Sequence, residues 1–165
     1  MGQSLYEADF FSWTLRQAQL LRAGQTELAD LANIAEEIET LERSEESKLE
    51  SAYMLIGMHL LKVLFQPERT TPSWRRTILH DRLAAAKLLR LNPGLKPKRE
   101  RLFASAYEDA RKEAADGTGM SLAIFPETPP FSLEQVEDEE YRPGRLNDLA
   151  QRKAASLRRR RYTND

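Results

Sequence analysis

The side chains best suited to chemistry lie in an acidic stretch in the first third of the chain. Glu36 and Glu39 are three residues apart, so in a helix they share one face, and Glu37 lies beside them. His59 follows downstream in the same helical stretch. Two carboxylates and an imidazole are ligands that Zn, Fe or Mn ions use. The sequence therefore offers Glu36, Glu39 and His59 as candidate catalytic residues of a metal-assisted hydrolase or nuclease.

The spacing around the two histidines does not fit a di-metal helical bundle. Such a site needs a Glu three residues before a His in each of two helices. At that spacing Ile56 precedes His59, and Thr77 precedes His80. The bundle motif is therefore absent.

A structural interpretation of the same residues competes with the catalytic one. In it Glu37 is solvated, Glu36 and Glu39 form ion pairs with later arginines, and His59 lies beside the core with a hydrogen-bonded ring. The arginines that could serve are Arg75, Arg76, Arg82 and Arg111. We favour this interpretation and expect no metal and no cofactor.

A second candidate site is the run Ser73-Trp74-Arg75-Arg76 at the predicted start of a helix. Free backbone amides at a helix N-terminus attract anions, and guanidinium groups bind phosphate. Ser73, Arg75 and Arg76 are therefore candidate anion-binding residues. The competing expectation is that Trp74 belongs to the core and that the arginines neutralise the acidic stretch.

The basic segment also raises the possibility of nucleic-acid binding. Residues 66–101 hold ten basic and three acidic side chains, and the segment 69–101 together with the C-terminal tail could follow a phosphate backbone. Residues 1–144 as a whole hold 18 basic and 24 acidic side chains. Because that balance is negative, we expect internal pairing rather than nucleic-acid contact.

Periodic apolar residues predict an all-α fold, a single helical domain of about four main helices around a long second helix. The first helix starts at the N-cap Asp9 and the second at the N-cap Asp30. The second extends to residue 64, as one helix or as two with a bend near Glu45 and Glu46, where the apolar pattern lapses. The apolar stripe expected in the core consists of Phe10, Trp13, Leu20, Leu31, Ile38, Leu60 and Val63.

The rest of the domain is predicted from its turn residues. Helices cover 74–91 and 97–115, and a loop-rich segment follows. Pro143-Gly144 marks the end of a helical domain of residues 1–144. Residues 145–165 carry seven basic and two acidic side chains, which indicates a flexible tail or frayed helix with weak affinity for polyanions.

Composition excludes several classes of function. The 165 residues contain no Cys, so disulfides, thiolate metal sites and thiol nucleophiles are excluded. No Gly-x-Ser-x-Gly or Gly-rich phosphate loop occurs. With 41% hydrophobic and 31% charged residues, and no secretory signal or apolar run of membrane-spanning length, we expect a soluble cytoplasmic protein without membrane contact.

Six segments in order carry a family resemblance. They are residues 6–13 (YEADFFSW), 31–39 (LANIAEEIE), 59–62 with 66–67 (HLLK, QP), 73–78 (SWRRTI), 106–111 (AYEDAR) and 125–127 with 131–136 (FPE, FSLEQV). Over about residues 5–143 the chain thereby resembles a bacterial family catalogued only as domain of unknown function number 29. The resemblance implies a bacterial, cytoplasmic, helical domain and brings no catalytic residue. Pro129 stands where similar sequences often have Cys.

The sequence thus favours a non-enzymatic helical interaction module that binds a protein partner or itself. The basis is that no complete catalytic set of residues is found. The alternatives are the metal-assisted enzyme and the nucleic-acid-binding component described above.

Overall fold

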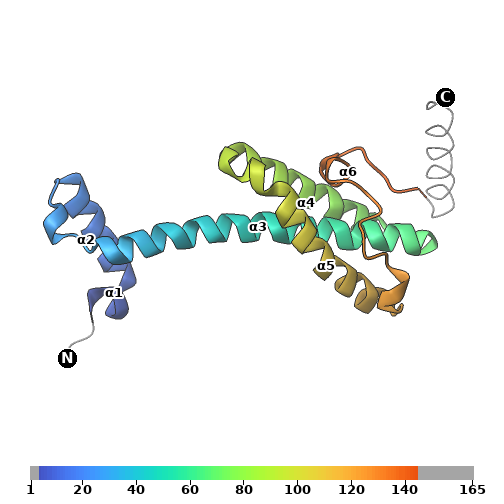
Figure 1. Cartoon of the computed structure of the whole chain (residues 1–165), viewed down its shortest axis with the longest axis horizontal. Helices are drawn as coiled ribbons and strands as arrows, with labels where there is room; N and C mark the ends of the chain where they lie inside the picture. Colours follow the sequence, from blue (N-terminus) through green and yellow to red (C-terminus); the bar gives the residue numbers. More distant parts are fainter. Residues whose placement is uncertain (1–3, 145–165) are drawn as a thin grey trace, which may run out of the picture. The chain divides into compact units, whose positions relative to one another are not determined.

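The computed structural model describes residues 4–144, and every regular element in that range is helical. The all-α prediction is confirmed (Figure 1). The chain divides between Glu45 and Glu46 into two compact units. We call them the first and the second unit. That residues 1–144 form one domain stays a prediction, and the predicted tail 145–165 lies outside the described residues.

The first unit consists of α1 (Leu5–Ala8), α2 (Phe10–Arg22), the 3-10 turn η1 (Thr26–Leu28) and the beginning of α3. The Ser4 hydroxyl accepts from the amide of Glu7 in a capping box at the start of α1. Asp9 caps α2 as predicted, with its Oδ1 accepting from Ser12 N at 3.0 Å. Gly24 then takes the left-handed conformation, with φ +71°, that lets the chain turn after α2.

The long helix α3 (Leu31–Phe65) is continuous, which decides between the two sequence alternatives. No Pro occurs within it, and its one Gly is Gly57. The predicted weak point at Glu45 and Glu46 is not a break in the helix. It is the place where the chain divides into its two units.

The second unit contains the hydrophobic core. Its elements are the rest of α3, then η2 (Pro67–Arg69), α4 (Pro72–Leu91), η3 (Pro93–Lys98), α5 (Arg99–Thr118), η4 (Leu122–Ile124) and α6 (Leu133–Glu137). Figure 1 shows α4 and α5 alongside the C-terminal part of α3, with α6 returning toward α4. Gly57 permits a close approach of α3 to α5, because a Cβ there would lie 3.3 Å from the Cβ of Ala110. The largest fully buried apolar residues are Tyr53, Phe125, Leu49, Ile56, Leu60, Leu61, Leu64, Leu102 and Val136.

A buried arginine on α4 holds the segment that follows α5. The Arg82 side chain is 1% exposed and donates to the backbone oxygens of Gln135 (3.0 Å), Val136 (2.8 Å), Glu139 (3.4 Å) and Tyr141 (3.0 Å). Burial is the main cause that lowers the pKa of Arg82, yet a guanidinium stays protonated in a protein. The Arg82 guanidinium thus donates to carbonyl oxygens that backbone amides would satisfy in a strand or helix.

Candidate interaction surface and pockets

Asp30 connects the helices of the first unit. Its Oδ1 accepts from the amide of Asn33, the N-cap contact predicted from the sequence, and its Oδ2 accepts from Asn33 Nδ2 at 2.7 Å and Trp13 Nε1 at 3.3 Å. Its own amide donates to Gln17 Oε1 at 2.8 Å. The bonds from Asn33 are the main cause that lowers the pKa of Asp30. A polar contact rather than an apolar core therefore joins α2 to the start of α3.

Tyr6 makes the second connection in this unit. Its hydroxyl donates to Glu37 Oε1 at 2.5 Å, and its ring packs against Trp13 with centroids 4.8 Å apart. The bond to Glu37 raises the pKa of Tyr6 to about 12. The expectation that Glu37 is merely solvated is wrong, because a ring 31 positions earlier in the sequence binds it.

The apolar stripe expected in the core divides between buried and exposed residues. Trp13 is 4% exposed and Leu60 is fully buried, as predicted. Leu31, Ile38 and Leu41 on α3 are 53%, 61% and 65% exposed. Burial was predicted wrongly for Phe10, which is 48% exposed, and for Leu31 and Ile38, because helical periodicity shows that a face is apolar and not that anything covers it. Other exposed large apolar residues of the first unit are Leu5, Phe11, Leu15, Leu21 and Leu28.

The exposed residues of α3 follow the spacing of a helix-pairing seam. Leu31, half-buried Ile34, Ile38 and Leu41 are spaced by three, four and three residues, as in the a and d positions of a coiled coil. We call Leu31, Ile38 and Leu41 the apolar stripe of α3. Among residues 1–45 there are nine acidic and three basic side chains, so this stripe lies in an acidic surrounding.

The proposed metal or acid–base group is split between the two units. Glu36 and Glu39 belong to the first unit, and His59 lies in the second unit about six helical turns further along α3. Glu39 forms an exposed ion pair with Arg43 at 3.7 Å. The arginines predicted to pair with it lie in the second unit. Within residues 4–144 no three His, Cys, Asp or Glu side chains are grouped so that they could hold a metal ion.

His59 lies between α3 and α4 in a polar environment that the sequence did not reveal. Its ring is 6.2 Å from that of Trp74, and Lys62 Nζ lies 5.9 Å from the Trp74 centroid. Burial, assisted by Lys62, lowers the pKa of His59, whereas Asp81 opposes this shift. The buried His59 Nδ1 and Asp81 Oδ2 have no hydrogen-bond partner among the described residues. The predicted hydrogen bond of the His59 ring is therefore not made through Nδ1.

The later arginines expected to neutralise Glu36 and Glu39 have other roles. Arg82 binds backbone oxygens, and Arg111 Nη2 donates to Phe125 O at 3.0 Å. Arg75 and Arg76 are exposed and make no side-chain hydrogen bond or ion pair within residues 4–144. The composition could not show which arginines pair with carboxylates, because backbone carbonyl oxygens also accept hydrogen bonds from arginine.

The start of α4 borders a cavity of about 380 Å³ in the second unit. Thr71, and not Ser73, is the N-cap of α4, with its Oγ1 accepting from Trp74 N at 3.3 Å. Of the predicted anion-binding residues, Arg75 lines the cavity, whereas Ser73 and Arg76 do not. The predicted core residue Trp74 is half-buried.

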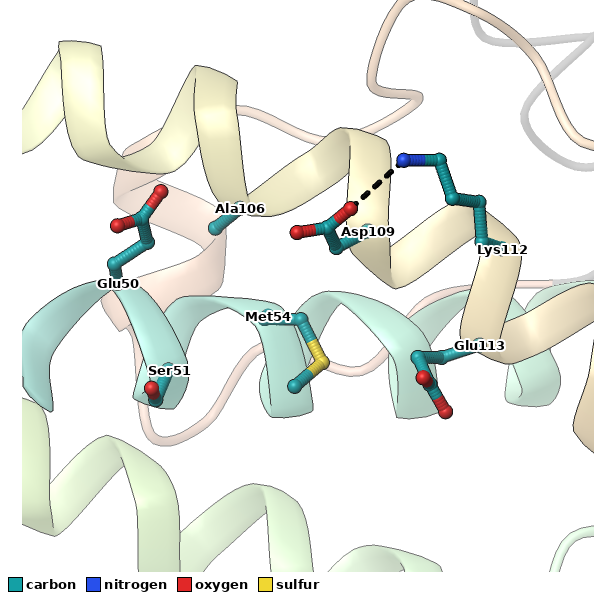
Figure 2. A pocket seen from close by; sticks show the side chains of 7 residues that line it. All are labelled: Glu50, Ser51, Met54, Ala106, Asp109, Lys112 and Glu113. Carbon is teal, nitrogen blue, oxygen red and sulfur yellow. Dashed lines mark hydrogen bonds and ion pairs between the residues drawn. The ribbon is translucent and has the colours of Figure 1, made fainter. Parts of the chain in front are cut away.

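A second cavity, of about 340 Å³, lies between α3 and α5 (Figure 2). Within residues 4–144 the one cation that lines it is Lys112, whose Nζ lies 2.9 Å from Asp109 Oδ1. Since three carboxylates lie around that single ammonium group, the cavity is acidic. Its lining residues are Glu50, Ser51, Met54, Ala106, Asp109, Lys112 and Glu113.

Sequence reasoning missed several of these residues. Thr70 and Arg142 line the cavity at the start of α4, yet they are separated by 72 positions in the sequence and belong to no motif. Asp81 is one of three acidic residues in the basic segment 66–101, and nothing in the sequence distinguishes it from the other two. No sequence signal marks Tyr6 as the partner of Glu37.

The comparisons with known proteins give a family and no activity. Among the helices of residues 4–144, none combines the length and the apolar character of a membrane span. No match was found among curated proteins or among solved structures. The model of one family, described as "Domain of unknown function DUF29", matches residues 5–142, and the chain belongs to that family.

Proposed function

We propose that this protein is a non-enzymatic helical interaction module whose first unit binds a basic amphipathic helix of a protein partner. The apolar stripe of α3 is the observation that carries the proposal. Leu31, Ile38 and Leu41 are each more than half exposed. Contiguous exposed apolar residues on a helix mark a surface that a second helix covers.

The energetics of the first unit support an external partner. Among its apolar side chains Trp13 is buried, whereas nine large ones are exposed. Burying a Leu or Ile side chain fully stabilises a protein by about 1.5–3 kcal/mol. A partner helix that covered the stripe of α3 would therefore supply several kcal/mol that this small unit does not obtain from its own packing.

The charges beside the stripe favour a basic partner over a second copy. In the heptad defined by the stripe, Asp30, Glu37 and Glu42 occupy the flanking e and g positions. In a pair of identical helices, parallel or antiparallel, these carboxylates would face one another and repel. Lys or Arg at the corresponding positions of another protein would instead be attracted to these carboxylates, with Glu37 and Asp30 keeping their hydrogen bonds within the first unit.

The test is a binding titration of the full chain with a fluorescent synthetic helix built from Leu and Lys in a heptad pattern. The paired change Ile38→Ser with Leu41→Ser should weaken binding on the order of tenfold or more, because two buried contacts are lost. Leu83→Ser is the matched control, since Leu83 is a half-exposed leucine on α4 of the second unit. It should leave binding unchanged.

Two outcomes would contradict the proposal. A peptide with Glu in place of every Lys that bound equally well would remove the charge argument. A stable homodimer in sedimentation that dissociated in the Ile38→Ser, Leu41→Ser chain would assign the stripe to a second copy. The metal-assisted enzyme and the nucleic-acid-binding component stay predictions.

A further inference from the structure

The cavity at the start of α4 has an apolar wall and a polar edge. It lies entirely within the second unit, separate from the apolar stripe of α3. Its apolar wall is formed by Val63, Pro67, Ile78 and Pro143. A volume of about 380 Å³ is within the range of sites that hold small organic molecules.

Two arginines supply the charge of this cavity. The Arg75 guanidinium has no hydrogen bond or ion pair within residues 4–144. Arg142 Nη1 donates to the backbone oxygens of Glu139 at 2.6 Å and Tyr141 at 2.9 Å, which fixes the side chain, and its other N–H groups make no hydrogen bond within residues 4–144. None of the seven described lining residues is acidic. Within residues 4–144, therefore, no lining carboxylate neutralises the positive charge at the cavity.

The hydroxyl of the lining residue Thr70 also lacks a partner within residues 4–144. Thr70 Oγ1 is buried and has no hydrogen bond to any described residue. Leaving a buried hydroxyl unpaired is energetically unfavourable, so such a group points to a missing acceptor or donor. Thr70 lies in the loop between η2 and α4, and Arg75 follows one turn into the helix.

We propose that this cavity binds a small organic anion that joins a phosphate group to an apolar body. Arg75 and Arg142 bind the phosphate oxygens with charge-assisted hydrogen bonds. The Thr70 hydroxyl donates to the same group, and the apolar body lies against Val63 and Ile78. Neither a bare inorganic ion nor an uncharged aromatic compound satisfies both parts of the cavity.

Phenyl phosphate is the probe, titrated into the ¹⁵N-labelled full chain and followed by amide chemical shifts. Saturable shifts are expected at Thr70, Arg75 and Ile78. Arg75→Gln and Arg142→Gln should each weaken binding on the order of tenfold. Arg76→Gln is the matched control, because Arg76 is an exposed neighbour on the same helix that does not line the cavity.

Further arms test the hydroxyl and the apolar wall. Thr70→Val keeps the shape of the side chain, so it should weaken phenyl phosphate binding while leaving the fold intact. Inorganic phosphate and phenol should each bind at least tenfold more weakly than phenyl phosphate. The proposal is overturned if phenyl phosphate gives no saturable shifts, if Arg76→Gln weakens binding as much as Arg75→Gln, or if inorganic phosphate binds as tightly as phenyl phosphate.

Discussion

At the scale of single residues, polar side chains make hydrogen bonds that the apolar pattern of the sequence does not predict. Arg82 is fully buried, yet its partners are backbone oxygens rather than carboxylates. Asp30 joins α2 to α3 through Trp13 and Asn33. In both places a side chain satisfies groups far away in the sequence, so the contact becomes visible only after folding.

Replacing Arg82 by Met should destabilise the second unit by about 3 kcal/mol, because buried carbonyl oxygens lose their donors. Arg82→Lys should recover part of this loss, because an ammonium group keeps the charge. It lacks the planar array of N–H donors with which a guanidinium binds several carbonyl oxygens at once. Urea unfolding of the three chains measures both effects. Equal stability of the Met variant and the parent chain would show that water replaces the guanidinium without cost.

Tyr6 should give the first unit a specific alkaline sensitivity. The bond to Glu37 raises the pKa of Tyr6 from 10.0 to about 12, so the folded chain holds this proton more tightly than the unfolded chain. The stabilisation is complete below pH 10 and is lost as the pH rises from about 10 to about 12. The difference in tyrosinate absorbance between the parent chain and Tyr6→Phe should titrate with a midpoint near 12. A midpoint near 10 would contradict the bond.

At the scale of elements, α3 has two different environments along one uninterrupted helix. Its first part presents Leu31, Ile38 and Leu41 outward, whereas its later part has Ile56, Leu60 and Leu61 fully buried. The apolar period is the same in both parts. What differs is whether α4 and α5 cover it, which depends on the rest of the chain and not on the helix itself.

The two tryptophans should differ in their contribution to stability. Trp13 is 4% exposed, so Trp13→Ala should cost about 3–5 kcal/mol. Trp74 is half-buried against His59 and Lys62, so Trp74→Ala should cost less, about 1–2 kcal/mol. Urea unfolding monitored by helical circular dichroism compares the two variants. A larger loss for Trp74 would contradict the described burial.

Gly57 should resist large replacements because α5 passes close to it. A Cβ at this position already lies 3.3 Å from the Ala110 Cβ, so Gly57→Leu should cost about 2–3 kcal/mol despite the high helix propensity of leucine. Gly94→Leu is the control, since a Cβ there meets no atom within 4 Å. Thermal unfolding of both variants checks the contrast, and similar losses would exclude close packing as the cause.

At the scale of the whole molecule, the two units obtain their stability in different ways. All residues of the main core cluster, from Leu49 to Val136, belong to the second unit. The first unit depends on one buried tryptophan, ring contacts and the bonds of Asp30 and Glu37. Local stability should therefore be unequal along the chain.

Amide hydrogen exchange should reveal this inequality within α3 itself. Amides of residues 35–44 should exchange much faster than those of residues 53–64, because few apolar contacts oppose opening of the first segment. Mass spectrometry of peptides from the exchanged chain measures the rates. Equal protection in both segments would mean that the helix opens as one cooperative element. Addition of a bound partner helix should slow exchange in residues 35–44.

The sequence predicted the helical class, the caps at Asp9 and Asp30 and the possibility of one long helix, because each follows from local rules. It did not predict which apolar faces are covered, as Leu31 and Ile38 show. For the candidate sites, Arg75 was predicted and does line a cavity, whereas Thr70 and Arg142 were missed. Thr70 and Arg142 come together because the segment after α5 folds back to α4. The apolar periodicity of the sequence does not predict this contact.

The Arg82 contacts also determine how the chain is exposed to proteases. The segment from Gln135 to Tyr141 has one short helix, and its remaining backbone is held by a single guanidinium from another element. A protease that cleaves after glutamate finds Glu139 and Glu140 in this segment. Cleavage there requires that the backbone bonds from Arg82 and Arg142 open, while α3, α4 and α5 can stay folded. Sensitivity at these two peptide bonds is therefore a local measure of whether α4 still holds the end of the second unit.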